Sequence, residues 1–259
     1  MLTKFFAMEQ KKFPLAAPSC LLRGNVAENC RYLQGRVREA GITLFEAESC
    51  LAYTREDLPQ DLARLGLAYH AHLPLDLEWG KGVSFVFGQV RGLVDMIAYL
   101  KADRFVLHPP QNRAKLEKFA VMWTEAGFDS RSLLIENING NDLSALWPVI
   151  LKKDLGVCLD LGHILAYAQQ DILNAPGLWE RVGLLHVYGL EKNKRHLGLE
   201  NLDNMGSACL QRILKNVNPG TVVLIELFSR EEFAKSRLLL SALMHKWGME
   251  LDYPYSGRE

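Results

Sequence analysis

The segment LGVCLDLGH, residues 155–163, shows the pattern that decides the fold. A short apolar run ends at Asp160, and His163 follows one helical turn later. An apolar run of this length is typical of a parallel strand that is covered on both faces. An acidic residue and a histidine directly after such a strand indicate a functional site at the carboxyl end of a sheet.

Runs of the same kind recur along the chain and alternate with longer helical patterns. Strands are predicted at residues 14–20, 42–48, 67–73, 104–109, 132–137, 155–160, 182–188 and 221–227. Helices are predicted at residues 25–40, 83–101, 113–126 and 231–247, with one more that runs toward Lys153 after the candidate caps Asn141 and Asp142.

Eight β/α units in 259 residues predict an α/β fold, a single (β/α)8 TIM barrel that forms one domain over residues 1–259. The alternative is an open doubly wound sheet. Its phosphate-binding signature, GxGxxG after the first strand, is absent from the chain.

Composition narrows the classes of partner and compartment. The formal net charge is zero, which disfavours a nucleic-acid backbone as the main partner. The five cysteines form no CxxC motif, so neither a disulfide framework nor a zinc knuckle is expected. No apolar run is long enough to span a membrane, and lysines interrupt the short apolar stretch at the start of the sequence. We therefore expect a cytoplasmic protein without a membrane partner.

A histidine or an acidic residue stands at the end of six successive predicted strands. They are His72, His108, Glu136, Asp160, His186 and Glu226, separated by 36, 28, 24, 26 and 40 residues. Each separation is about one β/α unit, so a barrel would gather all six at its C-terminal mouth, where active sites of this fold lie. Imidazole and carboxylate together suit zinc, manganese or iron, and several buried carboxylates need a compensating cation.

Other histidines and cysteines have different expected roles. His163 and His196 are further candidate metal ligands near the mouth. His70 lies on the same strand face as His72 but one layer deeper, where a core histidine is the better interpretation. Cys158 is expected inside the barrel and His245 on the surface. The absence of a GxSxG elbow gives no sign of a serine nucleophile.

With these residues in place, the chain resembles the endonuclease IV / xylose-isomerase-like barrel superfamily. The matching segments are LHPP at 107–110, IENING at 135–140, CLDLGH at 158–163, LLHVYG at 184–189 and LIELF at 224–228. Within that superfamily it looks most like the cobamide-remodelling phosphodiesterases called CbiR. That resemblance rests on YHAHLPLDLEWG at 69–80, LFE at 44–46, CLDLGHILAY at 158–167 and KRHLGLENL at 194–202.

The resemblance implies hydrolysis of the phosphodiester in the nucleotide loop of a cobamide. The products would be cobinamide phosphate and the lower-ligand riboside, such as α-ribazole, so that the lower ligand can be exchanged. Glu136 or Glu226 would orient the attacking hydroxide, and His163 and His196 would stabilise the leaving oxygen. Candidate substrate contacts are Glu46, Tyr188, Lys194 and Arg195.

The same resemblance implies a set of divalent metal ions. His72, His108 and Glu136 would hold one ion, and Glu136 would bridge to a second ion held by Asp160, His186 and Glu226. His163 and His196 would hold a third ion, but Lys194 stands where the DNA-repair members have an aspartate, and an ammonium group cannot bind a cation. Two ions are therefore expected, with zinc first and manganese, iron or cobalt as alternatives.

Three other functions remain open. A sugar isomerase or epimerase would hold one manganese ion with Glu136, Asp160, His186 and Glu226, and would not need His72 and His108. An abasic-site DNA endonuclease is disfavoured by the neutral charge and by Lys194. A corrinoid-binding or regulatory barrel with a vestigial site is the non-enzymatic alternative.

Overall fold

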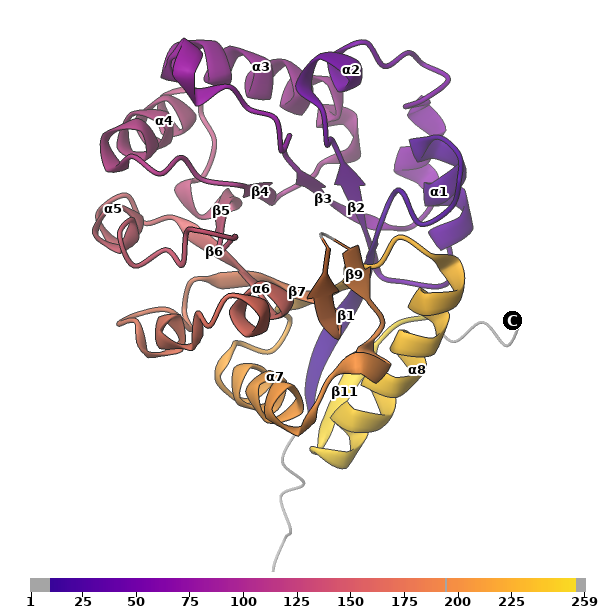
Figure 1. Ribbon diagram of the computed structural model, residues 1–259. Coiled ribbons are helices and arrows are strands. Elements are labelled where there is room, and N and C mark those ends of the chain that lie inside the picture. The colour runs from indigo at the N-terminus through magenta and orange to yellow at the C-terminus, as the bar shows by residue number, and fades with distance from the viewer. Residues whose placement is uncertain (1–9, 194, 255–259) are drawn as a thin grey trace, which may run out of the picture.

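Eight parallel strands close into a ring in the computed structural model of the chain, which describes residues 10–193 and 195–254 (Figure 1). The strands follow one another around the ring in chain order, and the ring closes where β10 pairs with β1. Their bounds are β1 (Lys11–Pro18), β2 (Glu39–Thr43), β3 (Ala68–His72), β4 (Phe105–Leu107), β5 (Leu133–Glu136), β6 (Gly156–Asp160), β7 (Val182–Val187) and β10 (Val222–Ile225). The predicted TIM-barrel fold is confirmed.

Helices surround the ring on its outer side (Figure 1). The α-helices are α1 (Val26–Leu33), α2 (Ala47–Leu51), α3 (Val83–Met96), α4 (Arg113–Glu125), α5 (Trp147–Lys152), α6 (Leu161–Ala166), α7 (Asn204–Asn216) and α8 (Arg230–Lys246). Short 3-10 turns are η1 (Gln60–Arg64), η2 (Trp79–Lys81), η3 (Ala98–Leu100), η4 (Ser130–Ser132), η5 (Gln170–Asn174) and η6 (Leu199–Asn201). The side chains of Asn112, Asp203 and Ser229 cap α4, α7 and α8, because each accepts a hydrogen bond from the N–H three residues later.

The strands bury side chains on both faces, as their apolar sequences predict. In β6, Val157 and Leu159 join the large core between sheet and helices, whereas Cys158 faces the inside of the barrel. The interior cluster consists of Ala16, Val106, Leu134, Cys158, Leu184, Val222 and Leu224. The barrel is therefore filled below its mouth, and Cys158 has the interior position expected from the sequence.

The first β/α unit is placed earlier than the sequence suggested. The strand expected at 42–48 is β2 at 39–43, and the helix expected at 25–40 ends at Leu33. Gly35, with φ +72°, lies just beyond that helix and turns the chain in a conformation that glycine adopts without strain. The segment LFE at 44–46 consequently lies in the loop after β2, next to the barrel mouth.

Three further features differ from the elements predicted from the sequence. The helix expected from Asn141 begins only at Trp147, because the Asn141 side chain accepts from the Leu143 N–H in a local turn, and Leu143 has φ +68°. The chain also continues beyond α8 into β11 (Met249–Asp252), which pairs in parallel with β1 outside the ring. A hairpin of β8 (Leu190–Lys192) and β9 (Arg195–Leu197) follows β7, where no strand is predicted from the sequence.

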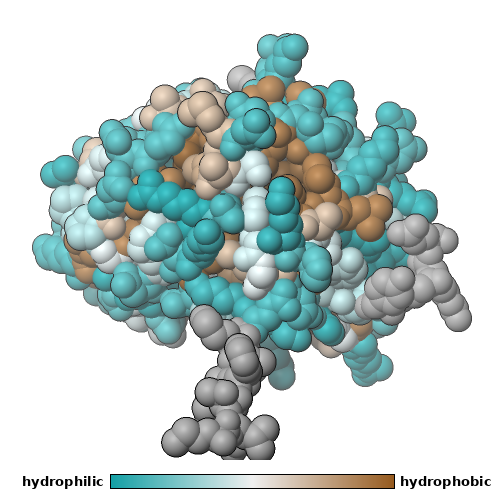
Figure 2. All heavy atoms as spheres, turned by 90° about the horizontal axis from the view of Figure 1, so that it is seen from below, coloured by the Kyte–Doolittle hydropathy of each residue, from teal (hydrophilic) through white to brown (hydrophobic). Residues whose placement is uncertain are grey.

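The outer surface is mostly polar on the side that Figure 2 shows, with apolar areas between the polar side chains. Among the exposed large apolar residues, Met205 lies on α7 and Leu238 on α8. Within residues 10–193 and 195–254, no helix has the length and hydropathy that a membrane span requires.

A buried ionic network lies inside the ring, one layer below the mouth. The Glu39 carboxylate pairs with His70 Nδ1 at 2.5 Å and with Arg104 Nη2 at 2.7 Å. Burial alone would raise the pKa of Glu39, but His70 and Arg104 hold it below its usual range. His70 is almost completely buried, in agreement with its predicted core role.

We expect Glu39→Gln to destabilise the fold by about 3 kcal/mol at pH 7, because it leaves Arg104 without its buried counter-charge. The folded-state pKa of Glu39 is depressed, so this contribution is present above the ordinary glutamate pKa and is lost as the pH falls through the lower, folded-state value. The difference from the wild type should therefore narrow in acid. Urea unfolding followed by circular dichroism measures both effects.

Glu78→Gln is the matched control, because Glu78 pairs with Lys81 on the surface with both side chains about half exposed. That change should alter the free energy of unfolding by less than about 1 kcal/mol. Equal effects of the two variants would contradict a stabilising role of the buried network.

Candidate metal centre

The six strand-end residues predicted as ligands lie together at the carboxyl ends of the strands. His72, Glu136 and Asp160 are the last residues of β3, β5 and β6, and His186 is near the end of β7. His108 and Glu226 follow β4 and β10 directly. The parallel register aligns these positions: Asp160 is paired with His186, and His186 with Leu224 of β10.

A first group of donor atoms forms around one oxygen of Glu136. His72 Nε2 and His108 Nε2 each lie 3.2 Å from Glu136 Oε2. The rings of the two histidines meet edge to face, with 5.1 Å between their centroids. Both ring nitrogens and the carboxylate oxygen therefore point into the same small volume.

A second group forms around the other oxygen of the same carboxylate. His186 Nδ1 lies 3.3 Å from Glu136 Oε1, 3.3 Å from Glu226 Oε2 and 3.8 Å from Asp160 Oδ2. Donor atoms of Asp160, His186 and Glu226 all lie within 4.8 Å of one another, a spacing that allows a shared metal ion. Glu136 faces both groups through its two oxygens, which is the geometry of a bridging carboxylate.

A third group contains an acidic residue that was not predicted from the sequence. Donor atoms of His163, Glu191 and His196 lie within 4.8 Å of one another, with His163 Nε2 3.4 Å from Glu191 Oε2. Glu191 and His196 are opposite each other in the β8–β9 hairpin. The resemblance implies an aspartate at position 194, where this chain has Lys194, which lies outside the described residues. The hairpin instead supplies a carboxylate from position 191.

Backbone carbonyl groups fix the ring orientation of three of these histidines. The Nδ1 atoms of His72, His163 and His196 donate to the carbonyl oxygens of Leu73, Asn137 and Glu226 at 2.9, 2.9 and 3.0 Å. A carbonyl can only accept, so Nδ1 carries a proton, and in the neutral ring Nε2 has the free lone pair. This second layer of hydrogen bonds is typical of histidines that bind metal ions.

The burial of the acidic residues supports a cation at this site. Glu136, Asp160 and Glu226 are at most 5% exposed, and the ion pairs of all three are with histidines. The buried Asp160 Oδ2 and Glu191 Oε2 have no hydrogen-bond donor. Unpaired buried carboxylate oxygens are costly, and a divalent ion would satisfy them, so the residues fit the predicted metal.

The same crowding separates the pKa values of the three carboxyl groups. Burial raises the pKa of Asp160 to about 6; His163 opposes this, while Glu136 and Glu226 add to it. Burial would also raise the pKa of Glu136 and of Glu226, but the nearby His186 outweighs the effect of burial on both. The pKa of Glu136 is held well below its usual range, and that of Glu226 is lowered to about 2. Burial would lower the pKa of His186, yet Cys158, Glu226 and Glu136 raise it well above its usual value.

The predicted substrate contacts have mixed positions. Tyr188 is fully buried and its ring stacks on His196 with 3.8 Å between centroids, so it supports a candidate ligand instead of contacting substrate. The exposed Arg195 pairs with Glu232 on α8 at 3.1 Å and is not part of the three groups. Glu46 is exposed in the loop after β2. Lys194 lies outside the described residues.

Two aromatic residues beside the metal groups were not singled out from the sequence. Phe45 contacts His72 edge-on at 6.2 Å and Phe228 at 5.9 Å between ring centroids. Phe228 also lies 5.4 Å from the His196 ring and is 44% exposed. Their positions in the loops that follow β2 and β10 were the available signal. They give the mouth an apolar rim on one side.

Comparisons with known proteins identify the fold. No protein-family profile and no curated protein sequence matches the chain. Among solved structures, a D-tagatose 3-epimerase-like protein matches with a TM-score of 0.74 and 14% identity, over 91% of this chain and 98% of that one. The IOLI protein with a bound zinc atom matches with a TM-score of 0.65 and 14% identity, over 91% and 99%.

The TTHB071 protein from Thermus thermophilus, from a crystal soaked with zinc chloride, has a higher identity of 24%, with a TM-score of 0.62 over 91% of this chain and 98% of that one. All these identities are below the level at which an activity can be transferred. The structural similarities and the closed ring of parallel strands establish the fold, a (β/α)8 barrel like those of the xylose-isomerase-like proteins it matches.

We expect Gly162→Ala to disturb the third group, because an added Cβ would lie 2.0 Å from a ring carbon of Tyr188. The buried Tyr188 ring would have to move, and His196 is stacked on it. The variant should be destabilised by about 1–3 kcal/mol through overpacking and should bind less zinc per chain. Thermal unfolding and elemental analysis provide the two measurements.

Gly88→Ala is the control, because Gly88 lies within α3 and an added Cβ there would meet no atom within 4 Å. This change should leave zinc content unchanged and stabilise the helix by about 0.5–1 kcal/mol. If Gly162→Ala retains full stability and zinc content, tight packing of Tyr188 under His196 is not required.

Proposed function

We propose that the chain is a metal-dependent phosphodiesterase that acts at a centre of two or three divalent ions. The observation that supports this proposal best is the number of donors, which are His72, His108, Glu136, Asp160, His163, His186, Glu191, His196 and Glu226. A zinc ion takes four or five ligands, so nine donors in overlapping groups exceed the needs of a single ion.

Such a centre suits the displacement of an ester oxygen from phosphorus. Bound divalent ions would supply a hydroxide at neutral pH and neutralise the phosphoryl oxygens. Glu136, which faces the first group with one oxygen and the second group with the other, would hold these two groups at a fixed separation. Glu226 would orient the attacking hydroxide, and His163 and His196 would stabilise the leaving oxygen from the opposite side of the phosphorus.

The proposed substrate is a cobamide, cleaved to cobinamide phosphate and α-ribazole. This choice rests on the resemblance of the segments at 69–80, 44–46 and 194–202 to the cobamide-remodelling enzymes. Their described residues include the end of β3, the loops that follow β2 and β3, and strand β9. The first two loops are joined, because the Leu75 N–H donates to the Phe45 carbonyl and the Ala47 N–H to the Asp76 carboxylate. Leu75 is 49% exposed there, available to an apolar part of the substrate.

The second candidate is a sugar isomerase or epimerase. The comparisons favour it over the phosphodiesterase, because a neighbour with one of the higher TM-scores is described as epimerase-like. Glu136, Asp160, His186 and Glu226 would suffice for the one ion of such an enzyme, and Glu136 and Glu226 could move the proton. The first and third groups favour the phosphodiesterase. In a one-ion isomerase, His72, His108 and the His163–Glu191–His196 group would have no metal ion to bind.

Incubation of the zinc-loaded protein with a complete cobamide should release α-ribazole and cobinamide phosphate, identified by mass. Glu136→Gln should lower turnover at least about a hundredfold while the protein stays folded, because the amide cannot bridge two cations. Glu250→Gln is the control, since Glu250 pairs with Lys12 on the surface, and it should retain full activity. Interconversion of ketohexoses by the same sample, without cleavage of the cobamide, would instead establish the second candidate.

The Glu191→Gln variant tests the third group. It should bind about one divalent ion fewer per chain than the wild type, because the group loses its carboxylate while the first two groups keep all their donors. Metal content after dialysis, measured by inductively coupled plasma mass spectrometry, gives the ratio. An unchanged ratio would mean that His163, Glu191 and His196 hold no ion.

A further inference from the structure

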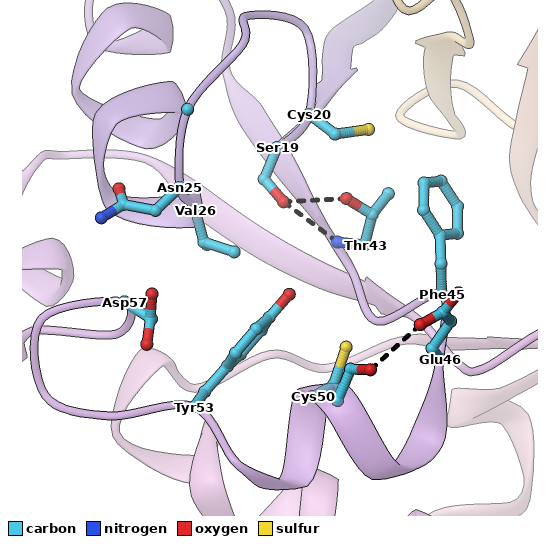
Figure 3. Close-up of a pocket in the computed structure, with 12 residues that line it drawn as sticks. Ser19, Cys20, Asn25, Val26, Thr43, Phe45, Glu46, Cys50, Tyr53 and Asp57 are labelled. Carbon is cyan, nitrogen blue, oxygen red and sulfur yellow. Dashed lines mark hydrogen bonds between the residues drawn. The ribbon is translucent and has the colours of Figure 1, made fainter.

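A cavity of about 500 Å³ lies beside the metal groups, between the loops that follow β1 and β2 (Figure 3). Ser19 and Thr43 form one wall, where the Ser19 hydroxyl is 3.1 Å from the Thr43 hydroxyl and accepts from the Thr43 N–H. The Tyr53 side chain points into the space from the opposite side. The volume is within the range of small-ligand sites, roughly 300–1,000 Å³.

This cavity adjoins the first two metal groups. Thr43 is paired in register with His72, and Phe45, which also lines the cavity, is in ring contact with His72. Cys20 lines it as well. A group bound in the cavity could therefore be part of a molecule whose phosphate lies at the metal ions.

The walls of the cavity have a definite chemical preference. They contain the carboxylates of Glu46 and Asp57 and the hydroxyls of Ser19, Thr43 and Tyr53, and no lysine, arginine or histidine is among the lining residues in the described part of the chain. Glu46 Oε2 accepts from Ser49, and Asp57 Oδ2 accepts from Thr54, which leaves one oxygen of each carboxylate for a ligand. Such walls repel anions and accept hydrogen bonds from hydroxyl groups.

We propose that this cavity binds the uncharged, hydroxyl-bearing riboside arm of the phosphodiester, while the phosphate lies at the metal ions. The inference rests on the proposed function and adds where one arm of the substrate binds. A complete cobamide is much larger than the cavity, so only an arm of nucleoside size fits. The separation of charge fixes the direction of binding, because the acidic walls disfavour the phosphate and the metal ions attract it.

Binding of free α-ribazole to the zinc-loaded protein, measured by isothermal titration calorimetry, tests this proposal without requiring turnover. Glu46→Gln and Thr43→Val should each weaken binding about tenfold, the loss expected when a hydroxyl group loses one good partner. Glu48→Gln is the matched control, since Glu48 lies on the same helix, α2, but does not line the cavity. It should bind α-ribazole as the wild type does.

Hydrolysis provides the second readout. Glu46→Gln should raise KM for the cobamide about tenfold, whereas Glu48→Gln should leave this KM within twofold of the wild type. A wild type that cleaves the cobamide but does not bind α-ribazole, or binds it equally well in Glu46→Gln, overturns the cavity proposal while the proposed function stands. Binding of α-ribazole that depends on Glu46, without hydrolysis of the cobamide by the wild type, supports the cavity proposal and overturns the proposed function.

Discussion

The negative charge buried at the barrel mouth is the constraint on which the rest of the site depends. Glu136, Asp160 and Glu226 come from three different strands, are nearly inaccessible to solvent, and lie within reach of the same imidazole, that of His186. His186 alone cannot neutralise three carboxylates, and the other histidines that face them carry a charge only when they are protonated. The remaining charge has to be balanced by protons or by bound cations, and the raised pKa of Asp160 shows the first of these tendencies.

The hydrogen bonds around the site favour bound cations as the balancing charge. The backbone carbonyls that accept from His72, His163 and His196 hold Nδ1 of each ring as the donor and orient the ring, so that Nε2 is the atom of the neutral ring that can bind a cation. Asn137 strengthens the arrangement, because its side chain exchanges two hydrogen bonds with the Asp160 backbone while its own carbonyl orients His163. The donor set is thus held in place before any ion binds.

The sequence predicted the barrel and the six strand-end residues because both depend on a simple regularity. Parallel strands separated by one β/α unit end at the same level, so spacing along the chain translates into position at the mouth. Glu191 does not follow this rule. Its place opposite His196 depends on a hairpin that turns at Asn193, with φ +53°, and nothing in the strand spacing specifies that turn.

Tyr188 shows a different limit of prediction. Its position after β7 made it look like a substrate contact, but the absence of a side chain at Gly162 lets the ring pack inward against the helix. Likewise β11 was missed, because its partner is the first strand, which is more than two hundred residues away. These features depend on contacts between distant segments, which local patterns do not specify.

The pairing of β1 has a consequence for how the protein is made. Besides β2, the neighbours of β1 are β10 and β11, so about two hundred residues must leave the ribosome before that edge of the sheet is covered. During this interval the nascent chain presents an open sheet edge, which is the usual starting point for aggregation. Glu226 emerges directly after β10, so the same event closes the ring and completes the second donor group, and an ion that needs this group would bind only in the last steps of folding.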